Sequence, residues 1–447
     1  RERVRAGEEK GGGAAGLHMN TRVLLALWCR GALAVSRPAA RWLSLRGGSL
    51  TSFTPDLDAS LLTTETTETP RERLPKEQLE FGKSFSDHML EVDWEADKGW
   101  TAPRIHPFQD LKISPAASAL HYGIEAFEGM KAYLDPEGKV RLFRPDLNLK
   151  RLNTSLVRLN FPQLDEEEFL RCLSALILQD KASSSLHLLE TYCANPTSTH
   201  LLLPILWQDW VPSGEGFSLY IRPTVISSYP YLGVGPSKQM KLFVITSPTG
   251  SYFKGGFKPV RLYADTKHVR AWPGGTGYAK LGANYAPTIM PAEEARKRTG
   301  CSQILWLHGP ERHVTEGGAM NVFFVFEASD GTKELVTPPL SSMILPGVTR
   351  QSILELAREW DEDGLTVSER ELTMAEVKEA AREGKLSEVF CSGTGAVISP
   401  VGSILYEGEE LTASNNDDIG PTAKRLWDEL LAIQYGKVDH EWSVKLE

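Results

Sequence analysis

The chain has 447 residues, with 49 basic and 58 acidic side chains and a formal net charge of −9. This length suffices for two or three domains, and the mild negative charge offers no cationic surface for nucleic acid or an anionic membrane. The 5 cysteines form no CxxC pair and the histidines no cluster at ligand spacing, so neither a zinc site nor a disulfide framework is indicated. These features favour a globular enzyme that acts on small molecules.

Residues 1–80 are predicted to be a disordered leader. Residues 1–18 begin with Arg and are rich in Gly and Glu, so Met19 is the expected start. The next segment contains apolar residues and no acid between its arginines, Arg22, Arg30, Arg37, Arg41 and Arg46. This composition is typical of a mitochondrial presequence and predicts a matrix protein, the alternative being a disordered basic tail. No stretch reaches the roughly 20 apolar residues that span a bilayer, so no membrane insertion is expected.

Residues 81–248 are predicted to form a small N-terminal α/β domain. Strand-like runs fall at residues 139–145, 217–226 and 241–248. A helical pattern, with apolar residues three and four apart, occupies residues 166–181. Residues 182–208 interrupt the short connection expected after this helix, and we interpret them as an atypical insertion. Their run LLLPILW is unusually apolar for a surface loop, so translation of an unspliced intron is favoured over an evolved element.

Residues 249–258, dense in Gly, Pro and Ser, are predicted to be an interdomain linker. Residues 259–447 are then a large C-terminal α/β domain. Its strand-like runs are residues 260–265, 303–309, 321–327 and 334–340, and its helical patterns are residues 349–360 and 423–436. The sequence therefore predicts an α/β (α+β) protein of two domains, with the ligand site in the cleft between them.

Two segments of the second domain contain residues suited to holding pyridoxal phosphate. Lys280 lies in a glycine-rich stretch whose small residues would let backbone pack against a planar ring, and Tyr285 supplies a nearby hydroxyl. Glu316 precedes an apolar strand, where a buried acid needs a positive partner such as a protonated pyridine nitrogen. Taken alone, a solvated loop lysine and a strand-edge glutamate in water are the commoner interpretations.

Two turns could bind an anion such as phosphate. Gly347, Val348 and Thr349 open a predicted helix, whose free N–H groups and dipole favour negative charge. Residues 392–395, Ser-Gly-Thr-Gly, form a second turn that can present amides and a hydroxyl. Arg151 could clamp a phosphate through two hydrogen bonds. A plain helix start, a plain strand connection and a surface arginine are the alternatives.

Successive sequence blocks resemble, in order, those of the branched-chain amino-acid aminotransferases, and they cover residues 81–436 apart from the insertion. The blocks are FGKSFSDHML, HYGIEAFEGMKAY, RLFRPDLNLKRL, SLYIRPT, RAWPGGTGYAKLGANYAPT, VTEGGAMNVFFVF, ELVTPPL, ILPGVTRQS and CSGTGAVISPV. Such ordered agreement is far more specific than any one motif. The resemblance implies the type IV fold of pyridoxal-phosphate enzymes, with the cofactor in the interdomain cleft, and a homodimer.

The resemblance also implies residue roles. Lys280 would be the catalytic lysine that holds pyridoxal 5'-phosphate as a Schiff base, Tyr285 would face the phenolic oxygen, and Glu316 would pair with the pyridine nitrogen. The phosphate site would comprise Arg151, Val348, Thr349 and Thr394. The substrate pocket would comprise Tyr122, Phe127, Tyr220, Arg222, Tyr252, Ala319 and Gly395, the last two beside the α-carboxylate. The loop around Leu232 and Val234 would close over the pocket of the other subunit.

The implied activity is reversible transamination of leucine, isoleucine and valine with 2-oxoglutarate, which gives branched-chain 2-oxo acids and glutamate. Aromatic walls suit an aliphatic side chain, while Arg222 and tyrosine hydroxyls can bind a carboxylate. One rival is a D-amino-acid aminotransferase or chorismate-type lyase, against which Tyr220, Arg222 and Tyr252 argue. The other is a catalytically inactive binding protein, which would lack a cofactor absorbance that borohydride removes.

The chain departs from the family pattern at three places. Ala319 stands where many members have threonine, so backbone or water would replace one hydrogen bond near the substrate. Ala396 and Ser399 occupy the positions of a CxxC redox pair found in some animal members, so no such thiol switch is expected. The third departure is the insertion, residues 182–208, which we expect to be dispensable and to contain no catalytic residue.

Overall fold

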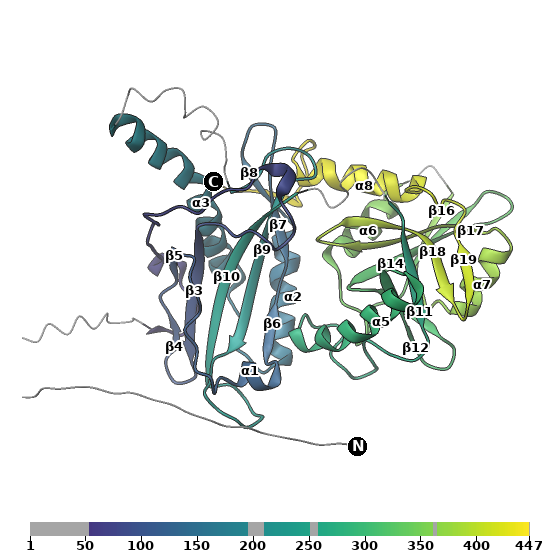
Figure 1. Cartoon of the computed structure of the whole chain (residues 1–447), viewed down its shortest axis with the longest axis horizontal. Helices are drawn as coiled ribbons and strands as arrows, with labels where there is room; N and C mark the ends of the chain where they lie inside the picture. Colours follow the sequence, from purple (N-terminus) through teal and green to yellow (C-terminus); the bar gives the residue numbers. More distant parts are fainter. Residues whose placement is uncertain (1–52, 195–209, 251–257, 361–363, 447) are drawn as a thin grey trace, which may run out of the picture. The chain divides into compact units, whose positions relative to one another are not determined.

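The computed structural model describes residues 53–194, 210–250, 258–360 and 364–446 (Figure 1). The predicted presequence, residues 195–208 of the insertion and most of the predicted linker lie outside the described residues. Residues 51–447 form one compact unit by their contacts. Among the helices of the described ranges, none combines the length and the apolar character that crossing a membrane requires.

The first sheet has eleven strands within the described residues. At its centre, β9 (Ser218–Ser227) and β10 (Gln239–Thr249) form a long antiparallel pair. The strand order is β1-β4-β3-β10-β9-β7-β8-β20, with β2 and β5 beside β3 and with β6 beside β9. The remaining bounds are β1 (Phe53–Thr54), β2 (Thr63–Thr64), β3 (His88–Glu95), β4 (Gly99–Thr101), β5 (Arg104–Pro107), β6 (Glu125–Phe127), β7 (Met130–Leu134), β8 (Val140–Phe143) and β20 (Ser443–Lys445).

The structure corrects the predicted extent of the disordered leader, because residues 53–80 are part of the fold. Strand β1 pairs with β4, and β2 pairs with β5. Leu57 is buried in the core of the first sheet, and the Ala59 N–H donates to the Glu168 carboxylate at 2.8 Å. The sequence prediction was wrong here because strands of two residues leave no alternating pattern, and long-range contacts hold this segment instead.

The second sheet has nine strands within the described residues, in the order β13-β12-β11-β18-β17-β14-β15-β16, with β19 beside β18. Strand β11 pairs in parallel with β12 and β18, whereas β14 pairs antiparallel with β15 and β17. The bounds are β11 (Val260–Asp265), β12 (Gln303–His308), β13 (His313–Gly317), β14 (Met320–Glu327), β15 (Lys333–Thr337), β16 (Leu365–Glu369), β17 (Leu386–Gly393), β18 (Val397–Tyr406) and β19 (Glu409–Thr412).

Helices pack their apolar stripes against these sheets. Helix α2 begins with Pro145 at its first turn and buries Leu149, Leu152 and Leu156, spaced three and four residues apart, in the first core. The described helices are α1 (Ser118–Tyr122), α2 (Pro145–Arg158), α3 (Glu166–Ala194), α5 (Ile289–Thr299), α6 (Val348–Arg358), α7 (Met374–Arg382) and α8 (Pro421–Gln434). Short 3-10 turns are η1 (Ala59–Leu61), η2 (Lys76–Gln78), η3 (Gly282–Asn284) and η4 (Ala286–Thr288). A second core lies under α6 and α8, and a third lies between the second sheet and α7.

The C-terminal strand returns to the first sheet, since β20 pairs antiparallel with β8. The predicted large domain, residues 259–447, therefore contributes its last strand to the sheet of the predicted small domain. The two sheets do not divide the chain at a single point. The division into domains at residues 249–258 stays a prediction.

Helix α3 continues to Ala194, beyond Lys181, where the sequence pattern ends the predicted helix. No glycine or proline occurs between Lys181 and Pro196, so nothing in the local sequence stops the helix. The described part of the insertion is therefore a helical extension of α3.

A deletion that joins Lys181 to Asp209 is expected to leave cooperative unfolding intact and to raise the soluble yield. The cost of closing a loop changes only slowly with its length, so the insertion is not needed to connect α3 with β9. Thermal unfolding and sedimentation of the deletion variant, beside the full chain, provide the check. A deletion variant that is soluble only in denaturant would show that the insertion is structural.

Candidate active site

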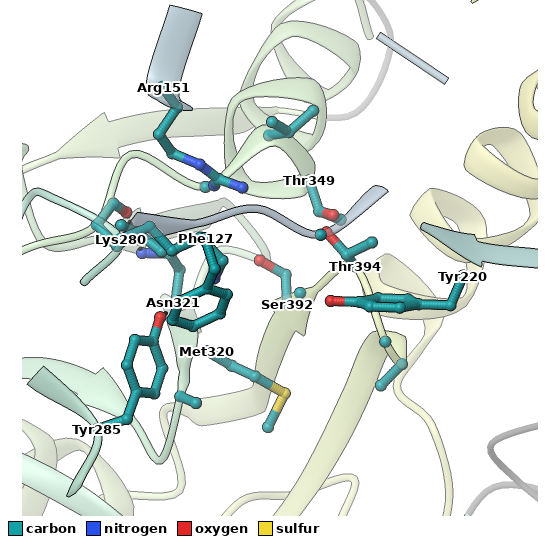
Figure 2. A pocket seen from close by; sticks show the side chains of 18 of the residues that line it. Phe127, Arg151, Tyr220, Lys280, Tyr285, Met320, Asn321, Thr349, Ser392 and Thr394 are labelled. Carbon is teal, nitrogen blue, oxygen red and sulfur yellow. Dashed lines mark hydrogen bonds between the residues drawn. The ribbon is translucent and has the colours of Figure 1, made fainter. Parts of the chain in front are cut away.

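A cavity of about 480 Å³ gathers residues from both sheets (Figure 2). The first sheet and its helix α2 contribute Phe127, Tyr220, Arg222 and Arg151. The second sheet and its connections contribute the remaining predicted residues in the wall, Lys280, Tyr285, Ala319, Val348, Thr349, Thr394 and Gly395. Eleven of the predicted site residues, counting both sets, therefore line one cavity.

Lys280 is fixed at the wall of this cavity by its own backbone. Its N–H donates to the Ser155 hydroxyl of α2 at 2.8 Å, and its carbonyl accepts from the Phe127 N–H at 3.0 Å. The side chain is therefore free to act while the main chain stays in place. Its Nζ donates to the Tyr285 hydroxyl at 3.1 Å and lies 4.9 Å from the centre of the Phe127 ring. Figure 2 shows the Tyr285 hydroxyl directed toward Lys280 and Phe127.

Glu316 lies behind the cavity wall, at the end of β13, and its side chain is only 2% exposed. One carboxylate oxygen pairs with the Arg270 guanidinium. The other accepts the Leu345 N–H at 2.9 Å. Asn321 and Leu345, which contact Glu316, line the cavity. The predicted acid thus reaches the cavity through its neighbours, and Arg270 is a partner that the sequence did not indicate.

Arg151 is held by a buried acid that the sequence analysis does not single out. Its Nε and Nη2 donate to the two oxygens of Glu128 at 2.7 and 2.8 Å, and its Nη1 donates to the Pro346 carbonyl at 3.1 Å. Glu128 also accepts from the Asn148 amide at 2.9 Å. Burial by itself would raise the pKa of Glu128, but the charge and hydrogen bonds of Arg151 outweigh burial and lower that pKa. The pair keeps the guanidinium rigid at the cavity wall.

Glu128→Gln is expected to lower the free energy of unfolding by about 3–5 kcal/mol, because it leaves the buried Arg151 charge without its counter-charge. Urea unfolding of the variant without added ligands measures this loss. Glu137→Gln, in an exposed turn that follows the same pair of strands, is the control and should change little. Equal stability of the Glu128 variant and the parent would contradict a structural role for the pair.

Two backbone features form an anion-binding side of the cavity. Helix α6 begins at Val348 after Gly347, and no side chain caps its first turn. A Cβ at Gly347 would lie 2.0 Å from Asn321 Oδ1, so only glycine fits this close approach. The turn between β17 and β18 brings Thr394 and its neighbours to the same cavity. Uncapped N–H groups and a hydroxyl are suited to phosphate.

Tyr220 and Arg222 occupy the same face of β9, since residues two apart in a strand point the same way. Arg222 Nη2 donates to the Tyr220 hydroxyl at 2.8 Å, and its guanidinium lies 4.9 Å from the centre of the Phe127 ring. Phe81 packs edge-on against Tyr220, with ring centroids 4.6 Å apart. Aromatic rings and one arginine therefore share this part of the cavity.

Some lining residues were not singled out in the sequence. These are Phe81, Gly129, Gln303, Met320, Asn321 and Leu345. All of them except Gln303 fall within the resembling blocks, which were the signal available for finding them. Gln303 lies in a predicted strand, and no motif around it signals chemistry.

Two predicted substrate residues are not placed in the cavity wall. Tyr122 does not line the cavity; its hydroxyl donates to the Leu232 carbonyl and its side chain is 41% exposed. Tyr252 lies outside the described residues. Leu232 and Val234 are 63% and 80% exposed. The roles of all these residues stay predictions.

Comparison with known proteins identifies the family. The family model of the class IV amino-transferases matches residues 125–404, more than half of the chain. A branched-chain amino acid aminotransferase from the source abbreviated T.th., solved with pyridoxamine 5'-phosphate, has a TM-score of 0.57 and 25% identity, covering 80% of this chain and 98% of its own. The chain therefore belongs to the class IV aminotransferases, and the predicted type IV fold is confirmed.

Curated relatives narrow the family. A branched-chain-amino-acid aminotransferase of Monosiga brevicollis is 47% identical over 87% of this chain and 92% of its own length. The mitochondrial rat enzyme is 46% identical over 87% of this chain and 91% of its own, and the cytosolic rat enzyme is 46% identical over 82% of both. The chain belongs to the branched-chain-amino-acid aminotransferase family, as the sequence blocks predict.

Proposed function

We propose that this chain catalyses reversible transamination of leucine, isoleucine and valine with 2-oxoglutarate, with pyridoxal 5'-phosphate bound through Lys280. The observation that carries the proposal is the Lys280 amine, 3.1 Å from the Tyr285 hydroxyl, in a cavity that also contains the first turn of α6. The relatives support the substrate class, and the solved enzyme with pyridoxamine 5'-phosphate supports the cofactor.

The cavity fits a planar, phosphorylated cofactor. Arg222 Nε and Ser392 Oγ line it, and both are buried without a hydrogen-bond partner among the described residues. Buried polar atoms in native proteins are nearly always paired, so these two atoms indicate a bound ligand. The uncapped first turn of α6 and the hydroxyls of Thr349 and Thr394 would hold the phosphate. Arg151, already paired with Glu128, would supply its remaining donor capacity there.

The chain's residues divide the chemical work. When bound, pyridoxal phosphate supplies an aldehyde that condenses with amines and a ring that accepts an electron pair. Lys280 Nζ would hold the cofactor and, once displaced by the substrate amine, would remove the proton from the substrate α-carbon. The Tyr285 hydroxyl would orient Nζ. Glu316, fixed by Arg270, would place negative charge where it favours a protonated ring nitrogen.

The substrate would lie against the aromatic part of the cavity. Phe81, Phe127 and Tyr220 offer apolar ring surface for an aliphatic side chain. Arg222, with its unpartnered Nε, would bind the distal carboxylate of glutamate. Ala319 and Gly395 would leave room for the α-carboxylate. The same pocket would therefore accept both amino donors in turn.

The activity is tested with purified protein, each branched-chain L-amino acid and 2-oxoglutarate, with glutamate as the measured product. We expect glutamate from all three L-amino acids and none from D-leucine, because the α-proton must face Lys280. A protein that contains the cofactor yet forms no glutamate from any of them would be a binding protein instead.

We also propose that the protein is a homodimer. An apolar surface is exposed on α1 and on the loop after β9, comprising Leu120, Tyr122, Tyr231, Leu232 and Val234. Exposed patches of this kind mark interaction sites. Val234→Asp should convert a dimer to a monomer in light scattering, whereas Val438→Asp, at another exposed valine, should not. A parent protein that is monomeric at every concentration would contradict the proposal.

A mitochondrial matrix location is proposed from the basic, acid-free composition that follows Met19. A fluorescent protein fused after residue 53 should enter mitochondria and lose the leader. Replacement of the five predicted presequence arginines by glutamine should leave the fusion in the cytosol. Import that does not depend on these arginines would contradict the assignment.

A further inference from the structure

We propose that Arg144 is a positioning residue for the phosphate of the cofactor, because it ties together the two helices that flank the phosphate site. These helices are α2, which contains Arg151, and α6, whose first turn contains Thr349. The inference rests on the proposed function, since it assumes that a phosphate binds there. Arg144 itself does not line the cavity.

The backbone of Arg144 is held in an uncommon conformation by the C-terminal strand. Its φ of 46° and ψ of 52° lie in the left-handed region, which a non-glycine residue adopts only when its surroundings require it. Its N–H donates to the Trp442 carbonyl at 2.8 Å, next to the pairing of Phe143 with Ser443. The residue that precedes α2 is thus anchored from the opposite end of the sequence.

The side chain of Arg144 is buried and contacts α6. Its guanidinium donates to both carboxylate oxygens of Glu355 and, from Nη1, to the Ser352 hydroxyl at 3.2 Å. The same guanidinium stacks on the Trp442 ring, 4.1 Å from its centre. A planar, forked cation matches a carboxylate and an aromatic face at once, which a lysine could not do.

These contacts reach the phosphate side of the cavity in one step on each helix. On α6, the Ser352 hydroxyl that accepts from Arg144 donates to the Val348 carbonyl at 2.9 Å, in the first turn of the helix. On α2, Arg151 lies two turns beyond Arg144 and donates to the Pro346 carbonyl, immediately before α6. Movement of α6 relative to α2 would therefore separate the N–H groups of its first turn from Arg151.

The test compares pyridoxal phosphate with pyridoxal, which lacks the phosphate but shares the ring and aldehyde. Protein freed of cofactor is titrated with each compound, and binding is followed by absorbance. Arg144→Met should weaken pyridoxal phosphate about tenfold or more while changing pyridoxal by less than about twofold. Glu355→Gln, which preserves side-chain shape, should cause a smaller loss in the same direction. Arg158→Met, an exposed arginine at the end of α2, is the matched control and should change neither constant.

The outcomes separate this inference from the proposed function. If the parent protein binds no pyridoxal phosphate, the proposed function fails. If the parent prefers pyridoxal phosphate and the Arg144 and Glu355 variants weaken both compounds equally, or neither, only the positioning role is overturned. Should Arg144→Met fail to fold, as thermal unfolding would reveal, the Glu355 variant alone decides. In a double variant, the losses should be less than additive, because both changes break the same contact.

Discussion

Lys280→Ala abolishes transamination, with an expected fall in kcat of at least about 10⁴-fold. The substitution removes both the amine that holds the cofactor and the base that removes the α-proton, and base catalysis alone contributes about 10²–10⁴-fold. The main-chain contacts of residue 280 with Ser155 and Phe127 involve backbone atoms of that residue only, so the loop should keep its place. The rate of glutamate formation from leucine is the measurement.

The control for this variant is Lys267→Ala, an exposed lysine ahead of the same loop, which should keep full activity. A small amine added to the Lys280 variant should restore part of the rate, because it can act as the missing base. A Lys280 variant within tenfold of the parent would refute the assigned role.

Glu316→Gln is expected to lower kcat by about 10²-fold and to leave cofactor content largely unchanged. The substitution preserves shape and the hydrogen bond from the Leu345 N–H but removes the charge that Arg270 and the ring nitrogen share. Loss of one preorganised electrostatic partner typically costs about 10²–10³-fold in kcat. Slower removal of the α-proton should appear as a larger isotope effect with leucine deuterated at that carbon.

Glu311→Gln, at an exposed position shortly before β13, serves as the control for Glu316 and should be neutral. Loss of the cofactor from the Glu316 variant, with an unchanged rate per bound cofactor, would instead assign Glu316 a purely structural role.

Local patterns predicted the parts of the site that are close in sequence. Lys280 and Tyr285 are five residues apart in a glycine-rich loop, and the structure places the amine beside the hydroxyl. The turn at Gly347 was visible because a glycine precedes an amphipathic helix, and α6 begins at Val348. In these places the chemistry and the local fold are encoded by the same few residues.

Long-range pairing was not predictable from the single sequence. Glu128 and Arg151 meet across 23 positions, and Arg270 and Glu316 across 46, without a repeating pattern that links them. The return of β20 to β8 joins residues about 300 positions apart, for the same reason. Propensity and periodicity describe segments, whereas these contacts depend on the assembled fold.

The most direct test of the central claim is to find where borohydride fixes the cofactor. The purified protein is reduced, digested and mapped by mass spectrometry, with and without prior addition of leucine. We predict that the pyridoxyl group is found on Lys280, and that leucine added before reduction, without an amino acceptor, prevents the labelling. A label on another lysine, or no label on a protein that forms glutamate from leucine, would contradict the assignment of Lys280.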